Sequence, residues 1–531
     1  MAKTAQTDFE VARLPFIPRH PGLLAAAVLL LAAVWIDLGP FHKKHTSDSL
    51  IFVLQSLYAW TPFEWQANRI GSLVPLLAMP FHNPFTNLLV QFGITIFLGL
   101  AAFFLAARYL APRRSWILAG VIGASVFLVC LSHDVWRYLR EVPQYAVSMA
   151  LGFAALNLLS PAAVSSRLLW ALRVAIAALL MLVAVWVNVS LPALLVPIIV
   201  CKAVLEWPGW PAARKRVALS SPASLLAQWP GASIVITAVA FLAVVMFAGA
   251  HAQAYGDQWG RLDLSPRHLL TAYARLAAGS VDVWLRQGHF PLALALIGSG
   301  ALLTLLTAAG RRALASSLPA IACLLAGAAS QYAVMGLLKW PEASGYDSRY
   351  LLPSIVLSIT ALAVFAAIQF MALFRDRSQQ WLAAAAPFAF LLVVTSAYPA
   401  PSIQKTRAYL DDLGQLTGEV IDSGCTHVAG DYWRVWTAVY HADLVLYERG
   451  SDRRIWGVSF RSRPTMKYWD VRPLSDWRVA QAIGEDPSVA TEWLGFYGLG
   501  SLSLRVEKTL KTIRVYTVEA RVVRPGEYDE E

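Results

Sequence analysis

The sequence predicts a polytopic α-helical membrane protein with about eleven transmembrane helices and a soluble C-terminal α/β domain. Of its 531 residues, 57% are hydrophobic and only 15% are charged, whereas a soluble domain has about 25% charged residues. This composition excludes a disordered chain, a fibrous protein and a simple cytosolic enzyme. A membrane-spanning helix needs about 20 largely apolar residues. Runs of this kind, one of them shorter, occupy 21–38, 84–107, 115–131, 143–159, 168–187, 191–201, 231–250, 291–309, 313–337, 350–374 and 379–398.

The distribution of basic residues between the loops predicts the orientation, because cytoplasmic loops are enriched in Lys and Arg. One set of loops has 15 Lys and Arg in 56 residues, and the alternate set has 11 in 112 residues. The N-terminus is therefore expected in the cytoplasm, and an odd number of spans places the C-terminus outside. The basic loops are 1–20, 108–114, 160–167, 202–216, 310–312 and 375–377; the external loops are 39–83, 132–144, 188–190, 251–290 and 339–349.

Residues 399–531 differ from the apolar part, 1–398, because they contain 17 Lys and Arg against 19 Asp and Glu. About 130 residues are enough to bury a core. We expect a helix at 433–442 and strands at 426–431, 445–447, 455–460, 502–506 and 513–518. The chain is thus divided into a transmembrane module, 1–398, and an extracytoplasmic α/β domain, 399–531.

The formal net charge of +11 belongs to the transmembrane module, where it follows the loop topology and the lipid headgroups. Nucleic acid is therefore not an expected partner. The four cysteines form no CxxC pair, which argues against a disulfide framework or a structural zinc site. The nucleotide-binding, metalloprotease and hydrolase motifs of soluble enzymes do not occur in the sequence.

The long external loops, 39–83 and 251–290, are where the chemistry is expected. In the first of them, 49–60 has helical periodicity with aromatic ends and is predicted to lie in the membrane interface. Asp48 precedes it and either caps the helix or acts as a base; the two roles are compatible. Arg69 either binds a phosphate or neutralises headgroups. Other polar residues of the loop are His45 and Glu64.

Loop 132–144 contains His133, Asp134 and Glu141. A histidine with carboxylates can bind a divalent cation such as Mg²⁺ or Mn²⁺, with Asp48 and Asp134 as the first candidate ligands. Alternatively, the acids form local ion pairs with Arg137 and Arg140.

Loop 339–349 ends next to a late span and contains Lys339 and Arg349. The planar guanidinium of Arg349 is suited to bidentate phosphate binding. The alternative is an arginine that extends to the membrane surface beside the aromatic belt.

Four short motifs give the sequence a family resemblance: His45-Thr46-Ser47-Asp48, Trp65-Gln66-Ala67-Asn68-Arg69-Ile70-Gly71, Asp347-Ser348-Arg349-Tyr350-Leu351-Leu352-Pro353 and Gly430-Asp431-Tyr432-Trp433. With many spans, an early aspartate in a long first external loop and a C-terminal external domain, the layout resembles the GT-C superfamily of polyprenol-dependent glycosyltransferases. Bacterial aminoarabinose transferases and protein O-mannosyltransferases belong to that class.

The resemblance implies transfer of a sugar from a polyprenyl-phosphate-linked donor to an envelope glycan, lipid or protein, with inversion, at the outer face of the bacterial cytoplasmic membrane. It implies that Asp48 is the base, and that Arg69, Arg349 and Lys339 bind the donor phosphate. His133, Asp134, Glu141, His45 and Glu64 are candidates to orient the acceptor or a divalent cation. The aromatic residues Tyr432, Trp433 and Trp436 either bind sugar or pack in the core.

Two other functions compete with this interpretation. A transporter or flippase of a lipid-linked saccharide is expected to have paired halves and ionisable residues at mid-membrane depth, which the sequence lacks. A non-enzymatic envelope assembly protein would not need such long external loops.

Overall fold

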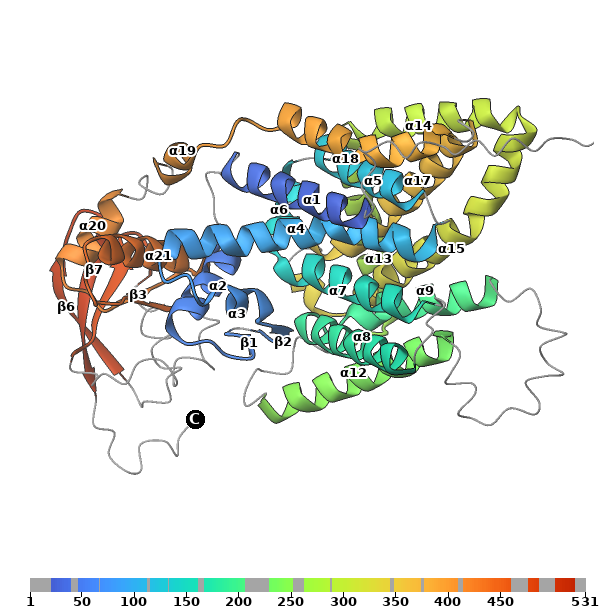
Figure 1. Ribbon diagram of the computed structural model, residues 1–531. Helices are drawn as coiled ribbons and strands as arrows, with labels where there is room; N and C mark the ends of the chain where they lie inside the picture. The colour runs from blue at the N-terminus through green and yellow to red at the C-terminus, as the bar shows by residue number, and fades with distance from the viewer. Residues whose placement is uncertain are drawn as a thin grey trace, which may run out of the picture.

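A bundle of long apolar helices has a sheet-containing domain at one end (Figure 1). The computed structural model describes residues 21–39, 46–65, 67–111, 115–131, 133–160, 167–205, 229–251, 262–286, 289–343, 348–373, 377–408, 414–459, 476–486 and 502–520.

The predicted apolar runs all form helices, because a backbone in lipid has to satisfy its own hydrogen bonds. Within the described ranges, five helical segments are long and apolar enough to cross a membrane: 84–110, 168–187, 230–249, 310–337 and 349–372. The helices of the bundle are α1 (Pro21–Leu38), α4 (Pro84–Leu110), α5 (Trp116–Cys130), α7 (Pro143–Leu159), α8 (Arg167–Val187), α9 (Leu191–Leu205), α12 (Trp229–His251), α14 (Phe290–Leu305), α15 (Ala308–Leu337), α17 (Leu352–Leu373) and α18 (Arg377–Ala397). The polytopic helical fold is thus confirmed.

Short elements fold within the loops that are predicted to be external. The first loop contains α2 (Ser47–Tyr58), the β1–β2 hairpin (Phe63–Glu64 and Ala67–Gly71) and α3 (Leu73–Ala78). The later loops contain α6 (His133–Glu141), α13 (Pro266–Val281), the π-helical turn η1 (Asp282–Arg286), α16 (Trp340–Ala343) and the 3-10 turn η2 (Ser348–Leu351). Structured loops of this kind can hold side chains in fixed positions.

The periodicity of α2 predicts that this helix lies against lipid, but the helix is buried within the protein. Nearly every side chain from Ser47 to Ser56 is buried. The helix packs against α3 and α4 on the bundle side and against α21 (Tyr432–Glu448) of the C-terminal domain. The expectation of an interfacial helix was wrong because the C-terminal domain, and not the membrane, covers its apolar face.

The described residues of the C-terminal domain form a mixed sheet of five strands. The strand order is β4-β3-β5-β7-β6, in which β3 is parallel to β4 and β5, whereas β7 is antiparallel to β5 and β6. The elements are α19 (Ile403–Ala408), α20 (Gly414–Asp422), β3 (His427–Ala429), α21, β4 (Trp456–Val458), β5 (Arg478–Ala482), β6 (Leu502–Thr509) and β7 (Ile513–Ala520). The predicted α/β character of this region is confirmed.

Helix α21 begins in a tight turn after β3. Gly430 has a φ of +148°, and a Cβ there would overlap the Glu485 carboxylate. Asp431 is the N-cap, and its carboxylate accepts a hydrogen bond of 3.0 Å from the Trp433 amide. The helix continues to Glu448, so the strand predicted at 445–447 was wrong: Leu444 and Leu446 belong to the buried side of a longer helix.

The segment from α2 to the β1–β2 hairpin and the C-terminal domain share one hydrophobic core. Ile51 and Leu54 of α2 and Trp65 of the hairpin are buried in the same cluster as Trp436 and Trp456. The Trp65 ring centroid lies 6.5 Å from the centroids of both other tryptophans. Consequently, α2 has a fixed position relative to α21.

A buried acid, Asp443, lies in α21 close to Tyr58 at the end of α2. Burial raises the pKa of Asp443 to about 7, although the Ile455 amide donates a 2.9 Å hydrogen bond to its Oδ1 and Arg454 attracts it. An acid whose pKa is raised in the folded state binds more protons there than in the unfolded chain. The contribution of Asp443 to the free energy of unfolding is therefore fully present at a pH below the ordinary pKa of aspartate. It is lost as the pH rises through the folded-state pKa of about 7.

Asp443→Asn should therefore remove a pH dependence from the domain. The asparagine still accepts the Ile455 hydrogen bond but has no proton to lose. Between the ordinary pKa of aspartate and pH 7, the free energy of unfolding of the wild-type domain should fall by up to about 1.4 kcal/mol per pH unit. That of the variant should fall less. Amide hydrogen exchange of Ile455–Val458 in the purified full chain, at several pH values, measures this loss. The exposed Asp452→Asn is the control, and an unchanged slope in Asp443→Asn would contradict the expectation.

Candidate functional site

Asp48 lies in the first turn of α2, where the bundle meets the C-terminal domain. Thr46 is the N-cap residue, and its carbonyl oxygen accepts a 2.9 Å hydrogen bond from the Ser49 hydroxyl. The Asp48 carboxylate does not cap the helix. Its Oδ2 is 3.0 Å from Nη1 of Arg349, and its Oδ1 accepts a 2.5 Å hydrogen bond from the Tyr432 hydroxyl. The side chain remains 22% exposed, so it can reach a substrate.

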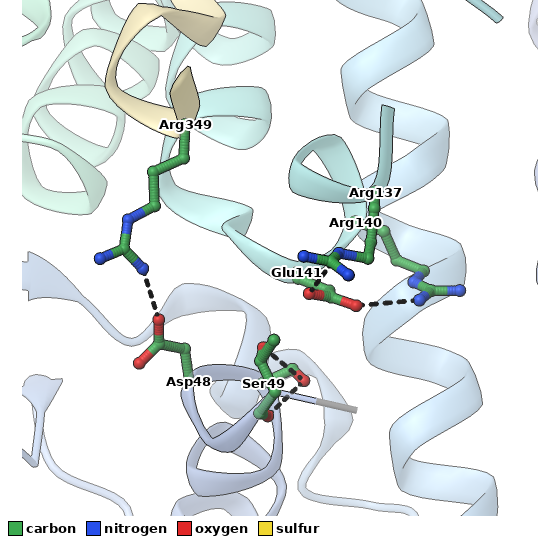
Figure 2. A network of polar contacts seen from close by, with 7 residues as sticks. Asp48, Ser49, Arg137, Arg140, Glu141 and Arg349 are labelled. Atoms are coloured by element: carbon green, nitrogen blue, oxygen red, sulfur yellow. Dashed lines mark hydrogen bonds and ion pairs between the residues drawn. The ribbon is translucent and has the colours of Figure 1, made fainter. Parts of the chain in front are cut away.

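Arg349 comes from η2, just before α17, and points across to Asp48 (Figure 2). Its Nη2 donates a 3.0 Å hydrogen bond to the Tyr350 hydroxyl, and its guanidinium carbon lies 5.0 Å from the centroid of the Tyr350 ring. The side chain is 15% exposed. A fixed, planar and accessible guanidinium of this kind can bind a phosphate with two parallel hydrogen bonds.

A second charged cluster, centred on Glu141 of α6, lies beside the start of α2 (Figure 2). The Glu141 carboxylate is 3.0 Å from Nη2 of Arg140 and 3.3 Å from Nε of Arg137, and the Thr46 side chain is close enough to lower its pKa. Burial raises the pKa of Glu141, and the two arginines partly oppose this effect. Because Thr46 is two residues before Asp48, this cluster lies beside the end of α2 that presents the carboxylate.

Tyr432 is the contact to Asp48 that the sequence does not predict. Its ring is fully buried at the start of α21, as expected for a core aromatic residue, yet its hydroxyl reaches Asp48. Trp436 is also buried, and its Nε1 donates a 3.3 Å hydrogen bond to the Ser459 hydroxyl. Only Trp433 of the three aromatic candidates is exposed, at 46%. The signal for Tyr432 was the motif Gly430-Asp431-Tyr432-Trp433, which the sequence connects with the family but not with Asp48.

The other candidates lie on several different elements. Arg69 lies on β2, and His133 and Asp134 begin α6; the placement of these three side chains, like all of His45, is outside the described part of the structure. Glu64 is buried in β1. Lys339 is exposed and lies close enough to Asp263, in loop 251–290, to interact with it electrostatically.

The predicted divalent-cation site is only partly covered by the described residues, because the side chains of His45, His133 and Asp134 lie outside them. No group of three or more His, Cys, Asp or Glu side chains converges within the described ranges. Two of the described carboxylates of that prediction, Asp48 and Glu141, contact arginines, which would repel a cation. The local ion pairs of Glu141 with Arg137 and Arg140 match the alternative that the sequence left open.

An apolar cavity of about 520 Å³ lies next to η2. It is formed by α13, η1, α15 and the start of α17, and its lining includes Tyr273, Trp284, Tyr332 and Ile355. Leu351, two residues after Arg349, also lines it. The turn η2 therefore carries both Arg349, a side chain suited to phosphate, and Leu351, which lines an apolar cavity.

Comparisons with known proteins give a likeness to solved structures only. No family model and no curated protein matches the sequence. ArnT from Cupriavidus metallidurans bound to undecaprenyl phosphate is similar over 94% of this chain and 98% of its own, with 12% identity and a TM-score of 0.43. Its apo state covers 93% and 97%, with 11% identity and a TM-score of 0.37.

A third similar structure is the archaeal oligosaccharyltransferase AglB from Archaeoglobus fulgidus, in complex with an inhibitory peptide and a dolichol-phosphate. It covers 88% of this chain and 70% of its own, with 13% identity and a TM-score of 0.37. With TM-scores below 0.5, these likenesses decide nothing about the activity of this chain, which has to be inferred from its own residues.

Proposed function

We propose that the protein is an integral membrane glycosyltransferase that moves a sugar from a polyprenyl-phosphate-linked donor to an acceptor hydroxyl, with inversion at the anomeric carbon. The observation that carries this proposal is the pair formed by Asp48 and Arg349. A carboxylate and a guanidinium, both partly exposed, lie 3.0 Å apart on two different loops, and the arginine is two residues before Leu351, which lines an apolar cavity. Such a site offers a base, a phosphate ligand and a space for a lipid chain.

The protein binds both the phosphate and the lipid chain of the donor. Arg349 binds the phosphate, and the Tyr350 ring beneath the guanidinium keeps it in place. The first isoprene units of the lipid enter the apolar cavity that begins at Leu351. Arg69 and Lys339 are further candidates to bind the phosphate.

The chemical step is a single displacement. Asp48 takes the proton of the acceptor hydroxyl, and the acceptor oxygen forms a bond to the anomeric carbon of the sugar. The bond from that carbon to the phosphate oxygen breaks, and polyprenyl phosphate leaves with the electron pair. The charge that develops on the phosphate is stabilised by the Arg349 guanidinium. Attack from the face opposite the leaving phosphate inverts the anomeric configuration.

The reaction takes place on the outer side of the bacterial cytoplasmic membrane, with the N-terminus in the cytoplasm and the C-terminal domain outside. The basic loops support this orientation. The contacts between the loop elements also support it. Helices α2 and α6 and the turn η2 lie against one another, and α2 lies against α21. Alternating spans put the loops that carry these elements on one side of the membrane, as such contacts require. The acceptor is an envelope glycan, lipid or protein.

The proposal is tested with the purified full chain in proteoliposomes that contain a labelled polyprenyl-phosphate-linked sugar and envelope extract. We expect acceptor-dependent release of polyprenyl phosphate and a labelled product whose anomeric configuration, measured by NMR, is opposite to that of the donor. Movement of intact lipid-linked sugar across the bilayer without release of polyprenyl phosphate would favour a flippase.

A further inference from the structure

Both carboxylate oxygens of Asp48 have partners from distant parts of the chain. Oδ2 contacts Arg349, which is 301 residues away, and Oδ1 accepts the hydrogen bond from Tyr432, which is 384 residues away. The two partners differ in kind. The hydroxyl of Tyr432 is neutral and belongs to the C-terminal domain, whereas Arg349 is the cation that the proposed donor needs.

We propose that donor binding activates the base: the donor phosphate displaces Asp48 from Arg349, while the Tyr432 hydroxyl stays hydrogen-bonded to the other carboxylate oxygen. Oδ2 then faces the acceptor hydroxyl. The donor binds first, and Tyr432 is a positioning residue that aims the carboxylate. This inference deepens the proposed function and rests on it.

The geometry makes the exchange at Arg349 possible. Only Nη1 of the guanidinium binds Asp48, and Nη2 binds the Tyr350 hydroxyl. A phosphate offers two oxygens to the planar guanidinium, which suits bidentate binding better than the single contact with Asp48 does. The pair is mostly buried, with 15% of the arginine and 22% of the aspartate exposed, so the guanidinium has to keep an anionic partner. In the exchange the phosphate replaces the carboxylate as that partner.

The geometry also explains why Tyr432 stays in place. Its ring is fully buried, and its carbonyl oxygen accepts a 2.8 Å hydrogen bond from the Ser47 hydroxyl, next to Asp48 in the chain. The capped start of α21 holds its backbone. Because α2 and α21 share one core, the Tyr432 hydroxyl cannot move away from Asp48 when the phosphate binds.

A double-mutant cycle on binding tests the exchange at Arg349 without any need for turnover. Titrations use polyprenyl phosphate in detergent with wild type, Asp48→Asn, Arg349→Gln and the double variant. If Asp48 competes for the guanidinium, Asp48→Asn should bind the probe about three- to tenfold more tightly. In the Arg349→Gln background the same change should have less than about a twofold effect. An equal gain in both backgrounds means simple charge repulsion and overturns the exchange.

Tyr432→Phe tests the positioning role, and Tyr440→Phe is the matched control. Both tyrosines are buried in α21 and bond to the bundle side, since the Tyr440 hydroxyl donates a 3.2 Å hydrogen bond to the Pro84 carbonyl oxygen. Loss of a hydrogen bond to a charged group should lower kcat of Tyr432→Phe about tenfold or more. Its KM for the donor should stay within about twofold, because the phosphate does not touch the hydroxyl.

The two tests separate the possible failures. A chain that binds no polyprenyl phosphate in any variant refutes the proposed function itself. Binding without coupling between Asp48 and Arg349 refutes only the exchange. Equal kcat losses in Tyr432→Phe and Tyr440→Phe, with equal losses of thermal stability, mean that Tyr432 is merely structural.

Discussion

Asp48→Asn should reduce sugar transfer by about 100- to 10,000-fold, the usual contribution of a general base. Asparagine has nearly the shape of aspartate, and it can still accept the hydrogen bond from Tyr432. It cannot take a proton from the acceptor hydroxyl, so the nucleophile has to attack in its neutral form. The measurement is the initial rate of transfer from a labelled lipid-linked sugar by the purified variant in proteoliposomes.

Asp431→Asn is the control for this substitution, because it makes the same chemical change at a second aspartate close to the site. Asp431 is the N-cap of α21, and asparagine caps a helix about as well as aspartate. Its activity should stay near that of wild type. Undiminished transfer by a correctly folded Asp48→Asn variant would falsify the assignment of the base.

Glu141→Gln should destabilise the protein by about 3–5 kcal/mol, the usual cost of removing one partner from a buried ion pair. Glu141 is 1% exposed and contacts two arginines. Without its charge, Arg140 and Arg137 repel each other next to α2. Arg140 cannot turn to water, because its side chain is fully buried against Phe92. Denaturant unfolding in detergent, with the full chain, measures the loss.

Two further variants define the cause of that loss. Glu342→Gln removes an acid that is 44% exposed and paired with His268, so it should cost less than about 1 kcal/mol. Arg137→Met added to Glu141→Gln removes one of the two repelling cations and should restore part of the stability. If the double variant is less stable than Glu141→Gln, repulsion between the arginines is not the cause.

The sequence predicts the helices of the bundle well, because each depends on a local property, the length of an apolar run. The early aspartate and the late arginine are also found locally, the first before the apolar segment 49–60 and the second next to a span. That Asp48 and Arg349 touch is beyond a single sequence, since no local pattern connects positions 301 residues apart. The roles of these residues, and the division of the chain at residue 398, stay predictions.

The failures have a common physical origin in tertiary contacts. The periodicity of 49–60 shows that α2 has an apolar face but not what covers it, and α21 covers it where lipid was expected. Leu444 and Leu446 suit a strand as well as a helix, and the buried side of α21 decides for the helix. Strand β5, Arg478–Ala482, has only three residues fully buried, all supported by β3 and β7, and it was not predicted.

The core that α2 shares with the C-terminal domain sets an order of events during synthesis. Ile51 and Leu54 leave the ribosome early, but their partners, up to Val518, are made last. Until α21 and the sheet follow, the side of α2 that faces the C-terminal domain has no permanent cover, and Asp48 lacks its contact with Tyr432. Contacts this distant form slowly, and a chain that ends before β7 cannot complete them. The surroundings of Asp48 are therefore complete only after the C-terminal domain has packed on α2.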